Sequence, residues 1–210
     1  MLRKVLLGLA ALIIILLGII YTRGSTFRVE RATRIEAPPD VVFALVNDFH
    51  AWDRWSPWAH LDPSMKATFG GPPSGPGATY HWSGNDKVGE GDMRITETRP
   101  LQAVVIRLEF IKPFASVNRA EFTLKPDGSG TKVNWVMTGP LDFMGKGMDL
   151  FVGMDKMIGS DFEKGLASMR REAEADAKKR ADAATASAVP AAPAAAMPTP
   201  PAAPTPAPAK

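Results

Sequence analysis

Three histidines, His50, His60 and His81, are the first candidates in this chain of 210 residues for general-base or metal chemistry. None has a second histidine or a carboxylate at a metal-ligand spacing such as H-E-x-x-H. The chain has no cysteine, which excludes thiolate metal sites, disulfides and cysteine nucleophiles. His81 alternates with Tyr80 and Trp82, so we expect it to point away from any cavity that they line. The sequence predicts no metal site and no cofactor, and it assigns no catalytic residue.

Two carboxylates, Asp161 and Glu163, lie beside an apolar stripe near the C-terminus and are the other candidates for acid–base chemistry. In one interpretation Asp161 enters a pocket, where burial raises its pKa. In the other, which we favour, it makes an ordinary hydrogen bond or salt link between a helix and a strand. A serine nucleophile has no support, because the G-x-S-x-G motif does not occur. These residues favour binding over catalysis.

Three of the five tryptophans, Trp52, Trp55 and Trp58, follow one another at intervals of three residues. That spacing places their indoles on one side of a helical turn, which Pro57 then ends by biasing the residue before it away from helix. Three indoles carry too much apolar area to remain in water, so we expect them to cover a core, a cavity or a partner. Cation–π recognition of a positive ligand is a further interpretation, which we do not favour.

Alternation of apolar and polar residues dominates the chain between residues 26 and 137, as expected of half-buried strands. In the first such segment Phe27, Val29, Thr33 and Ile35 share one face. The alternation predicts seven strands, at residues 26–35, 65–69, 78–83, 87–98, 103–111, 116–125 and 131–137.

Helical patterns flank these strands. Residues 39–47 predict a short apolar helix beginning at Pro39, and the glycine- and methionine-rich residues 141–153 predict a short mobile helix or lid. A long helix is predicted over residues 155–179, with its charged second half in solvent. The apolar stripe of this helix consists of Met154, Ile158, Phe162, Leu166 and Met169.

The two ends of the chain differ in composition from the middle. Residues 5–21 carry no charge, and their length suits a membrane-spanning helix better than a signal-peptide core. We therefore expect residues 1–25 to be an uncleaved transmembrane signal anchor, with a cleaved signal as the alternative. Residues 181–210 contain 14 alanines and 8 prolines, a composition that predicts a disordered tail. One domain, residues 26–180, is left between them.

The net charge of +3 is unevenly distributed. Residues 1–36 carry six basic and two acidic side chains, whereas residues 37–180 carry eighteen basic and nineteen acidic ones. The domain therefore lacks the basic excess that nucleic-acid binding requires, and we expect no nucleic-acid partner.

The order of the predicted elements is one strand, two short helices, six strands and a long helix. This order predicts an α+β fold with the helix on one face of an antiparallel sheet. A strongly curved sheet around a helix leaves a space between them, and such a space is a candidate apolar pocket.

Six short segments within residues 27–172 carry a resemblance to a known family. They are Ala37-Pro38-Pro39-Asp40-Val41-Val42-Phe43, Asp48-Phe49 with Trp52-x-x-Trp55-x-Pro57-Trp58, Asp62-Pro63, Trp82-x-Gly84-Asn85 with Val88-Gly89-x-Gly91, Gly128-x-Gly130-Thr131-x-Val133-x-Trp135, and Asp161-Phe162-Glu163-x-Gly165-Leu166. With these segments the chain resembles the START/Bet v 1-like (SRPBCC) superfamily, in particular its bacterial polyketide cyclase/dehydrase and lipid-transport group. The resemblance implies a helix-grip fold, in which a curved antiparallel sheet of about seven strands wraps around the long C-terminal helix and a hydrophobic cavity. It does not fix the activity, because the superfamily spans carriers, receptors, cyclases and co-chaperones.

We therefore expect membrane-anchored, non-catalytic binding of a lipid or another hydrophobic small molecule in an internal cavity. Residues 5–21 would cross the bacterial inner membrane once, with the domain on the periplasmic side. The alternatives are a cyclase/dehydratase-type enzyme and a protein-interaction module with a filled cavity, which docks a protein partner through the C-terminal tail. The predicted cavity wall consists of Trp52, Trp55, Trp58, Phe69, Tyr80, Trp82, Met93, Ile106, Leu108, Phe110, Phe122, Trp135, Met154, Ile158 and Phe162.

Overall fold

A seven-stranded antiparallel sheet forms the body of the protein, whose computed structural model describes residues 1–188. The strands lie in the order β1-β7-β6-β5-β4-β3-β2, so each strand pairs with its sequence neighbour except β1, which pairs with β7. All seven predicted strands are confirmed, with ends shifted by at most three residues. Their bounds are β1 Thr26–Ile35, β2 Lys66–Gly70, β3 Thr79–Ser83, β4 Glu90–Arg99, β5 Ala103–Lys112, β6 Ser116–Asp127 and β7 Gly130–Pro140.

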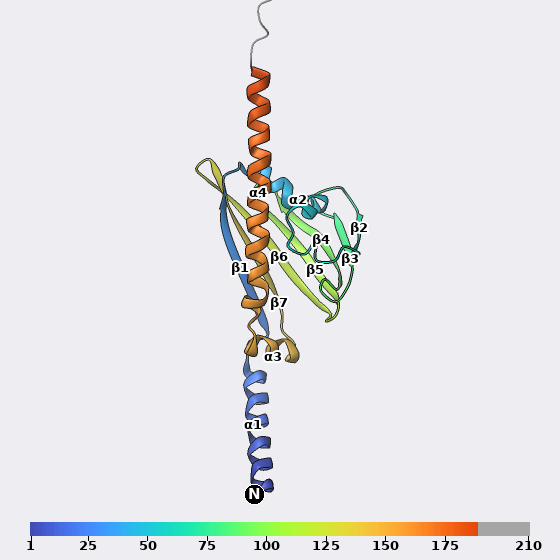
Figure 1. The fold of residues 1–210 in the computed structure, drawn as a ribbon, viewed down its shortest axis with the longest axis vertical. Coiled ribbons are helices and arrows are strands. Elements are labelled where there is room, and N and C mark those ends of the chain that lie inside the picture. Colours follow the sequence, from blue (N-terminus) through green and yellow to red (C-terminus); the bar gives the residue numbers. More distant parts are fainter. Residues whose placement is uncertain (189–210) are drawn as a thin grey trace, which may run out of the picture.

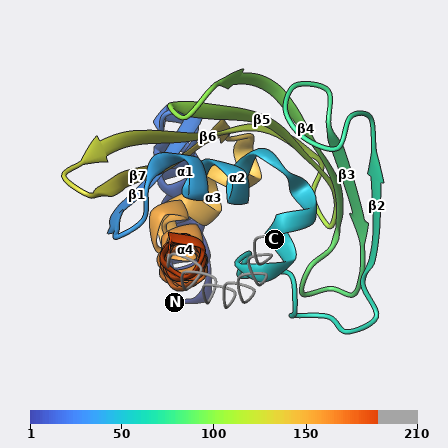
Figure 2. The same ribbon diagram turned by 90° about the horizontal axis from the view of Figure 1, so that it is seen from above.

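Helices lie at both ends of the sheet and along one of its sides (Figure 1). They are α1 Leu2–Thr22, α2 Pro39–Asn47, the 3-10 helix η1 Phe49–Arg54, α3 Phe143–Phe151 and α4 Met154–Ala188. Figure 2 shows the sheet curving around α4, which lies on the side of β1 and β7, with β2 and β3 opposite. The predicted α+β helix-grip class is confirmed.

The sheet has a charged outer face and an apolar inner face, because residue types alternate along its strands. On the outer face Arg119 pairs with Glu121 at 3.0 Å. On the inner face Val29, Ile106 and Phe122 have no exposed surface. Strand parity alone therefore identifies the face that α4 covers.

The apolar stripe of α4 packs against this inner face as predicted. The ring of Phe162 lies flat on the indole of Trp135 in β7, with centroids 3.8 Å apart and planes 8° from parallel. Phe162 and Met169 are fully buried, and Leu166 is 3% exposed. Burial of three large apolar side chains contributes about 1.5–3 kcal/mol each relative to exposure, so this contact holds the helix on the sheet.

α4 is longer than the sequence predicts, and one face of its second half is buried. The helix continues past Lys179 to Ala188, so the first part of the predicted disordered tail is helical. Residues 189–210, with the predicted partner contact of the tail, lie outside the described residues. The prediction that the second half lies in solvent is wrong for one face, because Ala173 is fully buried where α4 meets α2.

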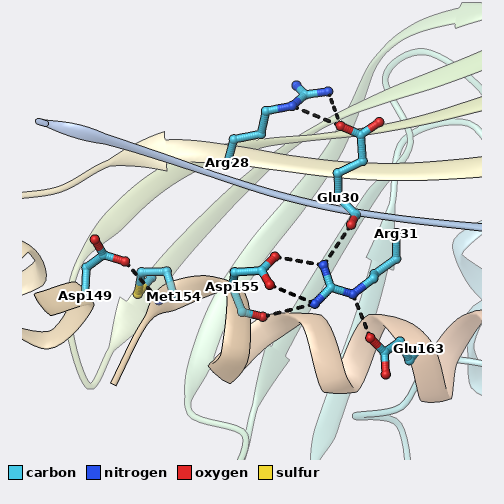
Figure 3. A network of polar contacts seen from close by, with 7 residues as sticks. All are labelled: Arg28, Glu30, Arg31, Asp149, Met154, Asp155 and Glu163. Atoms are coloured by element: carbon cyan, nitrogen blue, oxygen red, sulfur yellow. Dashed lines mark hydrogen bonds and ion pairs between the residues drawn. The ribbon is translucent and has the colours of Figure 1, made fainter. Parts of the chain in front are cut away.

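Arg31 ties the beginning of α4 to β1 (Figure 3). Its guanidinium donates to both carboxylate oxygens of Asp155, at 2.7 and 2.9 Å, and to Glu163 Oε1 at 2.7 Å. The hydrogen bonds from Arg31 hold the pKa of Asp155 below its ordinary value. Helix and strand are thus joined by a polar contact beside the apolar one.

α1 stands apart from the rest of the fold. It is long and apolar enough to cross a bilayer, at 21 residues or about 30 Å. Most of its large side chains are exposed, whereas Leu16 is half-buried and Ile20 is buried. By length and composition α1 suits either a membrane span or a signal sequence.

Arg54 of η1 makes a similar contact further along α4, to Glu172 at 2.8 Å and to Asp176 at 2.8 Å. We predict that Arg54→Gln lowers the free energy of unfolding at pH 7 by about 1 kcal/mol, since the groups are partly exposed. Arg54 lowers the pKa of Asp176, so this stability is present above the ordinary carboxyl pKa and is lost as the pH falls through the lowered one. Urea denaturation at pH 7 and pH 3 measures both effects.

The matched control is Arg170→Gln, which removes an exposed arginine from α4, the helix that Arg54 contacts. It should leave the free energy of unfolding unchanged within about 0.5 kcal/mol. Equal effects of the two substitutions, or an Arg54 effect that is as large at pH 3 as at pH 7, would contradict the assignment.

Candidate functional site: the inner face of the sheet

One row of inner-face side chains is completely dry. Strand pairing aligns Ile95, Ile106, Ala120, Met137 and Val29 across five neighbouring strands. None of the five is more than 5% exposed. We call these residues the closed row, and they form the floor of the core toward α2.

The next row lies two residues further along each strand, toward the end of the sheet from which α1 departs. It aligns Tyr80, Met93, Leu108 and Asn118 on β3 to β6, and it reaches Phe27 on β1. All but Asn118 are only half-buried, although they face the same side as the closed row. We call these residues the open row. The inner face is therefore covered at its α2 end and partly uncovered at its α1 end.

Indoles cover the α2 end. Trp52 and Trp55 lie 4.7 Å apart, and Trp55 meets Trp135 edge-on at 5.6 Å. The indole N–H of Trp52 donates to the carbonyl of Val46 at 3.1 Å, and that of Trp55 to the carbonyl of Leu45 at 2.8 Å. Because these bonds satisfy the polar tips, both tryptophans can be buried at little cost, and both belong to the hydrophobic core.

The fifteen predicted cavity-wall residues divide by burial into three groups. The buried ones are Trp52, Trp55, Trp82, Ile106, Phe122, Trp135 and Phe162. The half-buried ones are Trp58, Tyr80, Met93, Leu108, Phe110, Met154 and Ile158. Phe69 is 41% exposed at the edge of the sheet and stacks on His50 at 4.1 Å. The half-buried group contains three residues of the open row.

Three polar or charged side chains are buried within residues 1–188, namely Asp62, Asn118 and Thr131. Thr131 donates to a backbone carbonyl at 2.8 Å. Asp62 accepts from the Ser64 hydroxyl at 2.7 Å, and hydrogen bonds lower its pKa. Asn118 differs, because its Nδ2 donates to Ser116 Oγ at 3.1 Å while its Oδ1 has no partner. An unpaired buried acceptor costs about 1–3 kcal/mol, so Asn118 calls for an explanation.

Asn118 occupies the middle of the open row, beside Leu108 on one side and Gly139 on the other. A Cβ atom at Gly139 would overlap Asn118 Oδ1 and would also press on the ring of Phe27. Glycine at this position therefore makes the room that the amide occupies on the inner face.

The predicted acid–base candidates do not gather on the inner face. His81 lies 3.0 Å from Asp92 on the outer face, which confirms its predicted direction. Asp161 pairs with Lys164 of its own helix at 2.9 Å, so it neither enters a pocket nor makes the predicted link between a helix and a strand. Tyr80 lies on the open row, and burial raises its pKa, so its hydroxyl is uncharged near neutral pH.

Two hollows open away from the open row. One, of about 400 Å³, has Val105, Arg107 and Arg119 in its wall and therefore opens on the outer face. The other, of about 260 Å³, lies between η1 and β2 and is bordered by His50 and Phe69. Within residues 1–188, no group of three or more His, Cys, Asp or Glu side chains is arranged to hold a metal ion.

Phe27 and Asn118 are missing from the predicted cavity wall. The link that Arg31 makes between β1 and α4 was not predicted either. Phe27 and Arg31 share the inward parity of Val29, so parity alone contained the signal for them. Asn118 shares the inward parity of Phe122, but a polar residue in that pattern gives no sign of its missing partner.

The sequence matches the family described as polyketide cyclase / dehydrase and lipid transport over residues 26–174. The chain belongs to this family. The match covers the whole sheet, both short helices after β1 and most of α4. It confirms the resemblance to the START/Bet v 1-like superfamily, and it supports either hydrophobic ligand binding or a cyclase-type role.

Solved structures of several bacterial proteins share the fold. A Nitrosospira multiformis protein is 17% identical with a TM-score of 0.53, covering 72% of this chain and 99% of its own. A Rhizobium leguminosarum protein is 14% identical with a TM-score of 0.52, covering 71% and 97%. A Chromobacterium violaceum protein is 16% identical with a TM-score of 0.51, covering 71% and 97%. No curated protein matches the sequence. These likenesses concern the fold alone.

The two rows predict different costs for the same kind of truncation on one strand. We expect Ile106→Ala in the closed row to lower the free energy of unfolding by about 2–5 kcal/mol, because it leaves a cavity. Leu108→Ala in the open row should cost only about 1 kcal/mol, since part of its apolar area is already in water. Urea denaturation of the domain without ligand gives both values. Similar losses at the two positions would mean that the inner face is uniformly covered.

Proposed function

We propose that this protein is a membrane-anchored, non-catalytic binder of a lipid or another hydrophobic small molecule. α1 holds it in the bacterial inner membrane with the domain on the periplasmic side, and the ligand lies on the open row. The observation that carries this proposal is the half-buried row of Tyr80, Met93 and Leu108 directly beside the dry closed row. An apolar surface of this kind, bordered by a core, suits an apolar ligand.

The distribution of polar groups supports binding rather than catalysis. A general acid or base must reach the reacting group, and the His81–Asp92 pair lies on the opposite face of the sheet. Of the buried polar side chains, Asp62 and Thr131 are satisfied within the fold. A cyclase or dehydratase would need two or more ionisable groups on the open row. Among the residues aligned there, Tyr80 is ionisable, whereas Met93, Leu108 and Asn118 are not.

Asn118 supplies the polar feature of the proposed ligand. Its free Oδ1 accepts a hydrogen bond from a ligand hydroxyl or amide, which recovers the cost of leaving the acceptor unpaired. A ligand with an apolar body along Met93 and Leu108 and one donor group at Asn118 fits the row. The proposal thus favours a lipid with a hydroxyl or amide over a pure hydrocarbon.

The proposed location rests on α1 and the size of the domain. The uncharged part of α1 suits a bilayer core, and its N-terminal side carries Arg3 and Lys4. Long domains are translocated largely regardless of their charge, so the arginines that follow α1 do not oppose a periplasmic domain.

Leu108→Asp tests the ligand site. We predict that it weakens binding of an uncharged fluorescent acyl ester at least tenfold, because an apolar ligand would have to cover an ionised carboxylate. Fluorescence titration of the domain from residue 24 onward measures the dissociation constant, and mass spectrometry of the gently extracted full chain should find lipid in the unchanged protein only.

The control is Thr138→Asp, which introduces the same side chain on the outer face between Arg28 and Arg119. It should bind the ester as the unchanged protein does. If Leu108→Asp binds equally well, or if the full chain carries no lipid after gentle extraction, the proposed function is wrong.

A further inference from the structure

α3 is an amphipathic helix lying crosswise between α1 and the sheet (Figure 1). The helical period places Phe143, Met144, Gly147 and Phe151 on one side. Lys146 lies on the other side, together with Asp149. α3 is therefore built with one apolar face, as helices that lie in a membrane interface are.

This apolar face is unusually exposed. Phe143 is 50% exposed, Met144 64% and Phe151 70%, and Val152 directly after the helix is 51% exposed. Four large apolar side chains in ten residues are thus about half exposed or more, and clustered exposed apolar side chains mark binding surfaces.

The contacts between α1 and α3 fix how the two helices are oriented. Gly147, in the middle of the apolar face, has Ile20 of α1 as the nearest neighbour that an added Cβ would meet, at 3.8 Å. Arg23 at the end of α1 pairs with Asp149 at 3.3 Å, and Ile20 is buried there. The middle of the apolar face therefore meets the last turn of α1, while Asp149 and Lys146 of the polar side reach Arg23 and the carbonyl of Tyr21. α3 thus lies across the end of α1, at the level where α1 leaves the domain.

The same end of the sheet carries a second exposed apolar tip and the open row. Backbone N–H of Leu141, just before α3, donates to the carbonyl of Ser25, just before β1. The antiparallel order brings the β5–β6 connection to this end, where Phe114 is 66% exposed. The open row is the nearer of the two inner-face rows to this end, because Phe27 precedes Val29.

We propose that α3 lies in the headgroup–acyl boundary of the phospholipid leaflet that α1 enters, with its apolar face in the acyl region. The leaflet then covers Phe143, Met144 and Phe151, and the uncovered end of the inner face stands directly over the bilayer. A ligand reaches the open row from the acyl region without crossing water. This inference rests on the proposed anchoring by α1, and it adds a second contact with the membrane.

The chain has no cysteine, so single labels can be introduced into the full protein. We would label Met144→Cys and Phe151→Cys with an environment-sensitive fluorophore and reconstitute the protein in vesicles of phosphatidylcholine and phosphatidylglycerol. Leu12→Cys in α1 reports insertion of the anchor. Ser129→Cys, in the exposed turn at the opposite end of the sheet, is the matched aqueous control.

The proposal expects labels at 144 and 151 to emit at shorter wavelength than the label at 129, and to lose at least half of their emission to lipids brominated near the headgroup. Labels at 144 and 151 that match the one at 129, while the label at 12 is in lipid, would overturn the inference but leave acyl-ester binding intact. A label at 12 that stays in water would overturn both this inference and the anchoring.

Discussion

The position of α4 is the constraint on which the rest of the structure depends. The helix packs along the side of β1 and β7, held by the flat stack of Phe162 on Trp135 and by Arg31. It does not cross the middle of the sheet (Figure 2). Because a curved sheet of seven strands is wider than one helix, the strands on the far side must find other cover, and η1 supplies it only at the α2 end.

Because the cover is uneven, the two ends of the inner face differ in how far they are buried. Trp52 and Trp55 close the α2 end with satisfied indole N–H groups, while Met93 and Leu108 remain half-buried at the α1 end. The chain enters the sheet from that same end. α1 and the uncovered surface are therefore coupled by topology, since β1 is both the strand that follows α1 and the one that α4 holds. The proposed membrane-derived ligand would need this arrangement, because the open row and α1 lie at one end of the domain.

Most of the fold could be predicted, because alternation in the strands and the stripe of α4 directly encode which side is apolar. Ile106 and Leu108 show where the prediction stops. Both point inward by parity, yet only the pairing register and the position of α4 decide that the first is dry and the second is not. Arg31 has the same limit, since its partners Asp155 and Glu163 are more than a hundred residues away in sequence. Likewise, Ala173 reads as solvated until α2 is placed against it.

An uncovered apolar row is costly in water, and this cost is the strongest physical reason to expect a partner there. A large side chain that stays partly exposed forgoes up to about 1 kcal/mol of burial, and Phe27, Tyr80, Met93 and Leu108 are all partly exposed. The unpaired acceptor of Asn118 adds a similar penalty in their midst. The fold tolerates these losses because the closed row and the aromatic stack provide enough stability elsewhere. A ligand that covers the row and donates to Asn118 would recover both terms together, so the proposed selectivity for amphipathic molecules would come from the same residues that weaken the empty protein.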